Sequence, residues 1–215
     1  MPDFDLENAY IKTHPGAVVA GVDEAGRGPW AGPVVASAVI LNIDELPADL
    51  IDGLDDSKKL TALRRDVLFS ALHNCGAATI GVGQADVQEI DTLNILKATY
   101  RAMERAIDDL GHEVSLALVD GNRAPPLPCA VTTVIKGDGK SLSIAAASVI
   151  AKVTRDRHMT GLAAAFPGYG WETNMGYGTA KHQDAIDRLG VTDHHRRSFA
   201  PIKAALGANG SSESS

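Results

Sequence analysis

Four acidic side chains follow predicted strands and could together hold divalent metal ions. Asp23 and Glu24 end the first apolar stretch, Asp120 ends "LALVD", and Asp138 follows "CAVTTVI". Carboxylates that converge at one edge of a sheet repel one another unless cations lie between them. Clustered oxygen ligands suit Mg²⁺ or Mn²⁺ better than softer metals. Two such ions about 4 Å apart activate water and stabilise the leaving oxygen in phosphodiester hydrolysis. A single exposed Asp is usually only solvated, but four at successive strand ends indicate a metal site.

The elements that must position these acids alternate between strands and helices over the first two-thirds of the chain. Short apolar stretches predict strands at 17–22, 33–41, 77–83, 116–120 and 129–135, the first two paired antiparallel across a Gly/Pro-rich turn. The last third is mainly helical. This order favours an α/β fold with a five-stranded mixed sheet flanked by helices and a C-terminal helical extension.

Helical periodicity and capping signals place the predicted helices between these strands. Thr61 is an expected N-cap, a second helix begins near Thr92 and ends at Gly111, and "SLSIAAASVIAKVTRDRHMTGLAAAF" predicts one long helix. A further helix runs from about Thr179 to Leu189. We expect residues 1–205 to form one catalytic domain and residues 206–215 to be a disordered tail, because "GANGSSESS" is small and polar.

Two glycine-rich stretches resemble nucleotide-binding loops but lack a required glycine. "GVDEAGRGPWAG" has Ala31 where a dinucleotide-binding loop needs its third glycine, and its acids would face a pyrophosphate. "GDGKS" has Val134 where a P-loop needs its first glycine, so the loop is too short to surround a phosphate. Both nucleotide-binding classes are disfavoured. The histidines show no ligand spacing and predict surface or capping roles at His158, His182, His194 and His195.

The composition leaves a nucleic-acid partner open in spite of a formal net charge of −7 over 215 residues. Six acids and no base lie within 44–56, whereas five bases and two acids lie within 136–158, and phosphate binding depends on the local field. The two cysteines, Cys75 and Cys129, are far apart, and the chain shows neither a signal peptide nor a long apolar run. We expect a cytoplasmic monomer without membrane association.

Seven motifs, in order from Val18 to Pro201, are similar to those of bacterial ribonuclease HII, the type 2 ribonuclease H. They are "GVDEAGRGPWAGPVV", "DDSKKL", "LNILKATYRAM", "LVDGNR", "IKGDGKSLSIAAASVIAKVTRDR", "NMGYGTAKH" and "HHRRSF". The resemblance implies a ribonuclease H-like fold and an endonuclease that depends on Mn²⁺ or Mg²⁺. Its implied substrates are RNA/DNA hybrids and duplex DNA with a single embedded ribonucleotide, cut on the 5′ side to leave 3′-OH and 5′-phosphate ends. Such an enzyme supports ribonucleotide removal from DNA.

The resemblance also implies which residues perform the chemistry. Its catalytic metal ligands correspond to Asp23, Glu24, Asp120 and Asp138, all of which are present. Gly139 is a departure, because the family more often has alanine there. A glycine costs backbone entropy and loosens this loop, but it should not abolish metal binding.

The substrate-binding residues implied by the resemblance centre on a glycine-rich turn. Gly26, Arg27 and Gly28 match the ribose-reading "GRG", where glycine lets the main chain approach the 2′-hydroxyl that separates RNA from DNA. The same glycines would also suit a simple tight turn. Tyr177 matches a tyrosine that packs on the sugar, and the glycines on both sides make a core position improbable. Phosphate and backbone contacts are implied for Ser57, Lys58, Lys59 and Asn94.

Two alternatives remain open at this point. A polar stripe on the long helix either faces the site or forms a structural ion-pair strip; it contains Ser148, Lys152, Arg155 and Asp156. The chain as a whole could also be a resolvase-like DNA nuclease or a non-catalytic nucleic-acid-binding module. The first would lack a 2′-hydroxyl reader, and the second would gain nothing from placing four carboxylates against phosphates.

Overall fold

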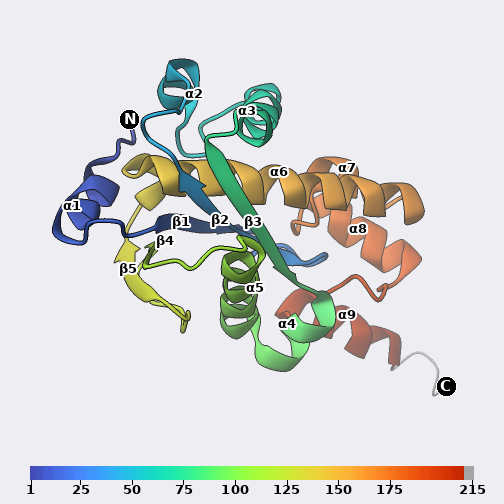
Figure 1. Cartoon of the computed structure of the whole chain (residues 1–215). Coiled ribbons are helices and arrows are strands. Elements are labelled where there is room, and N and C mark those ends of the chain that lie inside the picture. Colours follow the sequence, from blue (N-terminus) through green and yellow to red (C-terminus); the bar gives the residue numbers. More distant parts are fainter. Residues whose placement is uncertain (211–215) are drawn as a thin grey trace.

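A mixed five-stranded sheet lies at the centre of the computed structural model, which describes residues 1–210 (Figure 1). The strand order is β3-β2-β1-β4-β5. β1 pairs antiparallel with β2, and β2 with β3, whereas β4 is parallel to both β1 and β5. The predicted mixed sheet and its antiparallel first pair are therefore confirmed. The strands are β1 (Val19–Ala25), β2 (Val34–Leu41), β3 (Ala78–Ala85), β4 (Leu116–Asp120) and β5 (Ala130–Val134).

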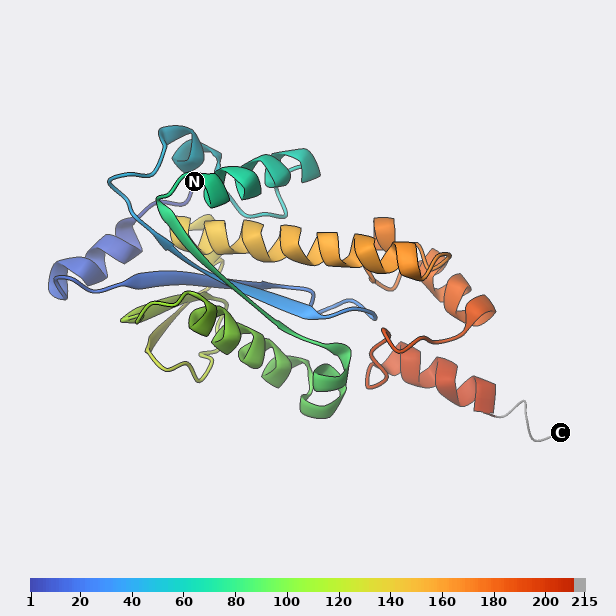
Figure 2. The same ribbon diagram turned by 45° about the vertical axis from the view of Figure 1, so that its right-hand side comes forward.

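Two long helices cover opposite faces of this sheet, as Figure 2 shows. α5 (Ile95–Asp109) packs on β3 and β2, and its inward residues include Ala98, Ala102 and Met103. α6 (Leu142–Ala165) packs on β1 and β2, and α3 (Ala62–Asn74) lies on its outer side. The two apolar cores, one on each side of the sheet, hold the strand ends in a rigid frame.

β1 and α6 approach each other so closely that only glycine fits at position 21. A Cβ built on Gly21 would lie 2.1 Å from the main-chain carbon of Ser143 and 2.3 Å from the nitrogen of Ile144. The neighbours are backbone atoms, so no side-chain movement could relieve the contact. The strand that ends in Asp23 and Glu24 is thereby pressed directly onto the start of α6.

The remaining helices frame these layers. α1 (Asp5–Thr13) precedes β1, and α2 (Ala48–Gly53) precedes α3. The C-terminal third forms a helical extension of α7 (Trp171–Asn174), α8 (Ala180–Leu189) and α9 (Ala200–Gly210), with its own core around Trp171. None of the helices among residues 1–210 has the length and apolarity required to cross a membrane.

Several predicted helix boundaries agree with the structure, and two do not. Thr61 caps α3 as expected, since its hydroxyl accepts a hydrogen bond from the N–H of Arg64 at 3.2 Å. The helix expected to begin near Thr92 is instead two helices, α4 (Val87–Leu93) and α5, separated at Asn94, whose φ is +72°. The tail expected at 206–215 is wrong at its start, because α9 continues to Gly210; residues 211–215 lie outside the described part.

Candidate active site

Strand register places two of the predicted carboxylates side by side. β1 and β4 run parallel with Val22 opposite Val119, so Asp23 and Asp120 follow this pair at the same edge of the sheet. Parallel strands present their carboxyl ends at one edge, where sites in α/β sheets are built. Asp23 is buried, with 5% of its surface exposed, and its Oδ1 accepts a hydrogen bond from the N–H of Glu24 at 2.7 Å.

The third carboxylate arrives from the 3₁₀ turn η1 (Gly137–Gly139), which follows β5. Asp120 orients this turn, because its Oδ1 accepts a hydrogen bond from the N–H of Gly137 at 2.7 Å. As a result, carboxylate oxygens of Asp23, Asp120 and Asp138 lie within 4.8 Å of one another and could hold a metal ion. The structure therefore brings three of the four predicted ligands into one cluster.

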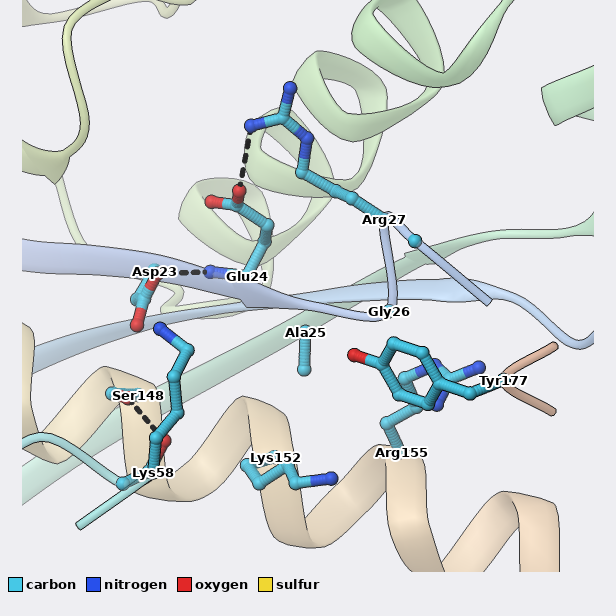
Figure 3. A pocket seen from close by; sticks show the side chains of 12 residues that line it. Asp23, Glu24, Ala25, Gly26, Arg27, Lys58, Ser148, Lys152, Arg155 and Tyr177 are labelled. Atoms are coloured by element: carbon cyan, nitrogen blue, oxygen red, sulfur yellow. Dashed lines mark hydrogen bonds and ion pairs between the residues drawn. The ribbon is translucent and has the colours of Figure 1, made fainter. Parts of the chain in front are cut away.

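Glu24 lies beside this cluster but not in it. Adjacent residues of a strand project to opposite faces, and Figure 3 shows the side chains of Asp23 and Glu24 leaving β1 on opposite sides. The Glu24 carboxylate instead pairs with the guanidinium of Arg27 at 3.2 Å. Glu24 as a metal ligand stays a prediction.

The electrostatics of the cluster favour the uptake of positive charge. Burial raises the pKa of Asp23 well above its ordinary value, and the negative charges of Glu24 and Asp120 raise it further. Burial also raises the pKa of Asp138, with Asp120 again adding repulsion. The pKa of Glu24 is raised by burial, although Arg27 opposes this shift. Holding these acidic side chains close together in their charged form costs free energy. A bound cation would remove that cost.

Lys58 supplies part of the missing positive charge. Its Nζ lies 3.8 Å from Oδ2 of Asp138 and points towards Asp23 (Figure 3). Burial favours the neutral amine, but the surrounding carboxylates, Asp23 and Asp138 foremost, together outweigh it and raise the pKa of Lys58. The side chain is 78% exposed, so solvent screens most of its effect on the buried acids.

A pocket of about 340 Å³ opens next to the carboxylates. Asp23 and Glu24 line one part of it, the main chain of residues 26–28 lines another, and the ring of Tyr177 stands over the same space (Figure 3). Tyr177 is 47% exposed, so it is not a core aromatic. A Cβ built on Gly28 would lie 3.5 Å from Cε1 of Tyr177. The predicted ribose-reading turn and the predicted sugar-packing ring thus face each other.

The polar stripe of α6 contributes to the same pocket. Ser148, Lys152 and Arg155 line it, and the hydroxyl of Ser148 donates to that of Ser57 at 2.7 Å. Lys152 also pairs with Asp156 at 2.7 Å. The stripe therefore both faces the site and contains a structural ion pair, the two roles expected for it.

Two predicted substrate contacts lie apart from the pocket. The Nζ of Lys59 pairs with Asp55 at 2.9 Å. The side chain of Asn94 accepts hydrogen bonds from the N–H groups of Leu96 and Lys97 and caps α5. Neither residue lines the pocket, although Ser57 and Lys58 do.

The prediction of surface or capping roles is wrong for His182 and His195, which are fully buried. Nε2 of His182 accepts a hydrogen bond from the indole N–H of Trp171 at 3.0 Å and lies 3.1 Å from Nε2 of His195. Nδ1 of His182 lies 3.0 Å from the carbonyl oxygen of Tyr177. Sequence spacing could not reveal this pair, since thirteen positions separate the two rings. They support the loop that carries Tyr177.

Comparison with known proteins decides the family. The family model described as ribonuclease HII matches residues 20–202. A ribonuclease HII of Rhodospirillum rubrum is 57% identical over 206 residues, which cover 96% of this chain and 92% of that protein. The ribonuclease HII of Paramagnetospirillum magneticum is 57% identical over 202 residues, or 94% of this chain and 97% of that protein. This chain belongs to the ribonuclease HII family. Membership confirms the resemblance seen in the motifs and makes the chain an enzyme, a ribonuclease H.

Two solved structures share the fold. The ribonuclease H2 of Pyrococcus horikoshii OT3 has a TM-score of 0.73 at 28% identity, covering 89% of this chain and 98% of that chain. A Bst-RNase HIII in complex with Mn²⁺ has a TM-score of 0.72 at 20% identity, covering 89% of this chain and 70% of that chain. The expected ribonuclease H-like fold, with a five-stranded mixed sheet and C-terminal helices, is confirmed.

Proposed function

We propose that this enzyme hydrolyses RNA in RNA/DNA hybrids and incises duplex DNA on the 5′ side of a single embedded ribonucleotide. The observation that carries the proposal is the carboxylate cluster beside a pocket formed by Gly26, Arg27, Gly28 and Tyr177. Asp23 belongs to both, so the proposed cleavage site and the proposed reader of the sugar adjoin each other. Such an activity removes ribonucleotides from DNA, as the family membership suggests.

The carboxylates suit Mg²⁺ or Mn²⁺. All potential ligand atoms of Asp23, Asp120 and Asp138 are oxygens, which these hard cations prefer, and their mutual repulsion is relieved by a divalent charge. Glu24 is the proposed fourth ligand. A pair of bound ions would supply Lewis acidity, lowering the pKa of water and stabilising negative charge on the departing oxygen. A Mn²⁺-bound relative of the same fold is consistent with this assignment.

The chain's own residues bind and orient the substrate. The cations of Lys58 and Lys152 at the pocket attract the phosphate backbone. The main chain of residues 26–28 is open to a 2′-hydroxyl, and the ring of Tyr177 offers a flat apolar surface to a sugar. Ser57 is tied to Ser148 and holds the start of the Lys58 loop against α6. Attack by water, without a covalent enzyme intermediate, would leave 3′-OH and 5′-phosphate ends.

One assay separates this proposal from its two rivals. A DNA duplex with one ribonucleotide, labelled at either end, is incubated with the enzyme and with Mg²⁺, Mn²⁺ or EDTA. We expect metal-dependent cleavage only at the 5′ side of the ribonucleotide and no cleavage of the matched all-DNA duplex. Cleavage of the all-DNA duplex would indicate a resolvase-like nuclease, and binding without cleavage in either metal would indicate a binding module.

A further inference from the structure

Arg196 connects the C-terminal extension to the turn that lines the pocket. It follows α8 and is fully buried. Its guanidinium donates to four main-chain carbonyl groups: Nη2 to Gly26 at 2.5 Å and to Pro33 at 3.2 Å, Nη1 to Arg27 at 3.0 Å, and Nε to Gly32 at 3.0 Å. One side chain therefore holds both ends of the glycine-rich loop.

This arginine carries a buried charge without a carboxylate partner. Within residues 1–210 it makes no ion pair, and burial lowers its pKa to about 9. Arg155 is similarly buried and donates to the carbonyl groups of Ala31, Pro33 and Met175. Burying a cation against neutral dipoles is costly, and this cost is offset by the main-chain carbonyl groups that the two arginines bind. The position therefore needs a reason beyond packing.

Peptide geometry supplies that reason. The carbonyl and N–H of a trans peptide point in opposite directions. Because Arg196 holds the carbonyl groups of Gly26 and Arg27, the N–H groups of Arg27 and Gly28 are directed away from it. Across the described residues, neither N–H finds a hydrogen-bond acceptor. Two free donors are thus presented by a loop that lines the pocket.

A second arginine prevents this loop from turning over. Gly26 has a φ of +96°, and a Cβ built on it would lie 2.0 Å from Nε of Arg155. The peptide after Gly26 is therefore packed against the guanidinium of Arg155 and hydrogen-bonded to that of Arg196. A rotation that exchanged its N–H and carbonyl directions would break the bonds to Arg196 and leave that cation unpaired.

We propose that Arg196 is a positioning residue that sets ribonucleotide specificity, by directing the N–H groups of Arg27 and Gly28 towards the 2′-hydroxyl oxygen of the substrate. This inference rests on the proposed function and adds the residue that enforces it. Deoxyribose offers no oxygen at the 2′ position, so donors directed at it reward only a ribonucleotide. A loop that presented its carbonyl groups instead could no longer donate to the 2′-hydroxyl oxygen. It would lose these two bonds while retaining the phosphate contacts of the lysines.

The test compares two neighbouring arginines that differ in environment. Arg196→Met removes the four bonds, and Arg196→Lys keeps the charge but can reach fewer carbonyl groups. Arg197→Met removes the same charge from a side chain that is 56% exposed and paired with Asp193 at 2.9 Å. Each variant is assayed with Mg²⁺ for kcat and KM on the single-ribonucleotide duplex. The inhibition constant of the matched all-DNA duplex is measured in the same reactions, and its ratio to KM reports the preference for the ribonucleotide.

We expect the preference ratio to fall about tenfold in Arg196→Met, the effect of one lost hydrogen bond. Arg196→Lys should recover part of it, and Arg197→Met should match the wild type. An equal weakening of both duplexes in the Arg196 variants would overturn the inference, because it would reveal a general charge or stability effect. A wild-type enzyme without any ribonucleotide preference would instead refute the proposed function itself.

A measurement on the wild-type protein covers the case in which the Arg196 variants do not fold. Amide ¹⁵N NMR with Ca²⁺ in place of Mg²⁺ follows Arg27 and Gly28 while either duplex is added. The inference requires both amide signals to move further with the ribonucleotide duplex than with the all-DNA duplex. Identical shifts with the two duplexes would overturn it.

Discussion

Asp120→Asn should inactivate the enzyme and at the same time stabilise its metal-free form. Asparagine keeps the shape of the side chain, and its amide oxygen can still accept the hydrogen bond that Asp120 receives from Gly137 at 2.7 Å. The substitution removes one of three negative charges whose oxygens lie within 4.8 Å of one another. The repulsion felt by Asp23 and Asp138 therefore falls, and so does the affinity for divalent metal.

The size of the stabilisation follows from these distances. Two unit charges 4.8 Å apart repel by about 3.5 kcal/mol at an effective dielectric constant of 20. Protonation already relieves part of this, because the pKa values of Asp23 and Asp138 are raised. The weaker hydrogen bond to Gly137 costs about 1 kcal/mol. A net gain of about 2 kcal/mol remains, equivalent to about 5 °C in Tm for a chain of this size.

The gain should depend on pH in a defined direction. A carboxyl with a raised pKa in the folded state binds its proton more tightly there than in the unfolded chain, so the wild type loses stability as pH rises from the ordinary carboxyl pKa through the raised value. Asp120→Asn should lose less stability than the wild type over this pH range. Its advantage in EDTA should be complete at pH 8, smaller at pH 5 and absent at lower pH, where the carboxyl groups are neutral in both states.

Urea and thermal unfolding at pH 8 and pH 5, with EDTA or with Mn²⁺, test these expectations. At a metal concentration of 100 times Kd the wild type should gain about 2.7 kcal/mol, and the variant little. Cleavage by the variant should fall by at least about 100-fold. Asp66→Asn, which removes an exposed charge paired with Arg157, is the control and should change neither property. A variant that is less stable than the wild type in EDTA at pH 8, or that cleaves normally, would refute the metal-site assignment.

Three further predictions concern the surroundings of the cluster. Tyr177→Ala should lower kcat/KM on the single-ribonucleotide duplex about tenfold with little change in Tm, since the ring is 47% exposed; unchanged discrimination between one ribonucleotide and none would contradict its role. Gly21→Ala should cost about 3 kcal/mol in urea unfolding, because its Cβ would meet the backbone of Ser143 at 2.1 Å; an unchanged midpoint would show that β1 and α6 can separate freely. His182 and His195 should remain neutral from pH 8 to 5.5 by ¹⁵N NMR, because burial lowers both pKa values, that of His195 to about 4; a titration midpoint near 6.5 would contradict the buried pair.

The strand ends show how far sequence patterns reach. Short apolar stretches predicted β1 and β4, and Asp23 and Asp120 follow them. That the two strands are adjacent and parallel depends on long-range pairing, which local periodicity does not report. The sequence therefore predicted which acids follow these strands, but the separation of Asp23 and Glu24 onto opposite sides of β1 appeared only in three dimensions.

Two other differences arose where side-chain hydrogen bonds decided the structure. The helix expected from Thr92 is broken at Asn94, where a positive φ starts a new helix capped by the asparagine side chain. His182 and His195 are polar residues whose burial depends on mutual hydrogen bonds and on Trp171. The partners of the two histidines lie outside the window that a periodicity argument uses, whereas the cap at Asn94 is local and binds the N–H groups of Leu96 and Lys97.

The sequence by itself determined the five strands, most of the longer helices, the residue types of the carboxylates and the family, because these depend on local spacing and residue type. The tertiary structure decided which groups meet and what state they adopt. Arg196 contacts Gly26 across 170 positions in the chain, and no composition or motif placed it there. The raised pKa values of Asp23 and Asp138 likewise require burial and mutual proximity. Both are consequences of long-range packing, which excludes water and brings distant charges and dipoles within a few ångströms.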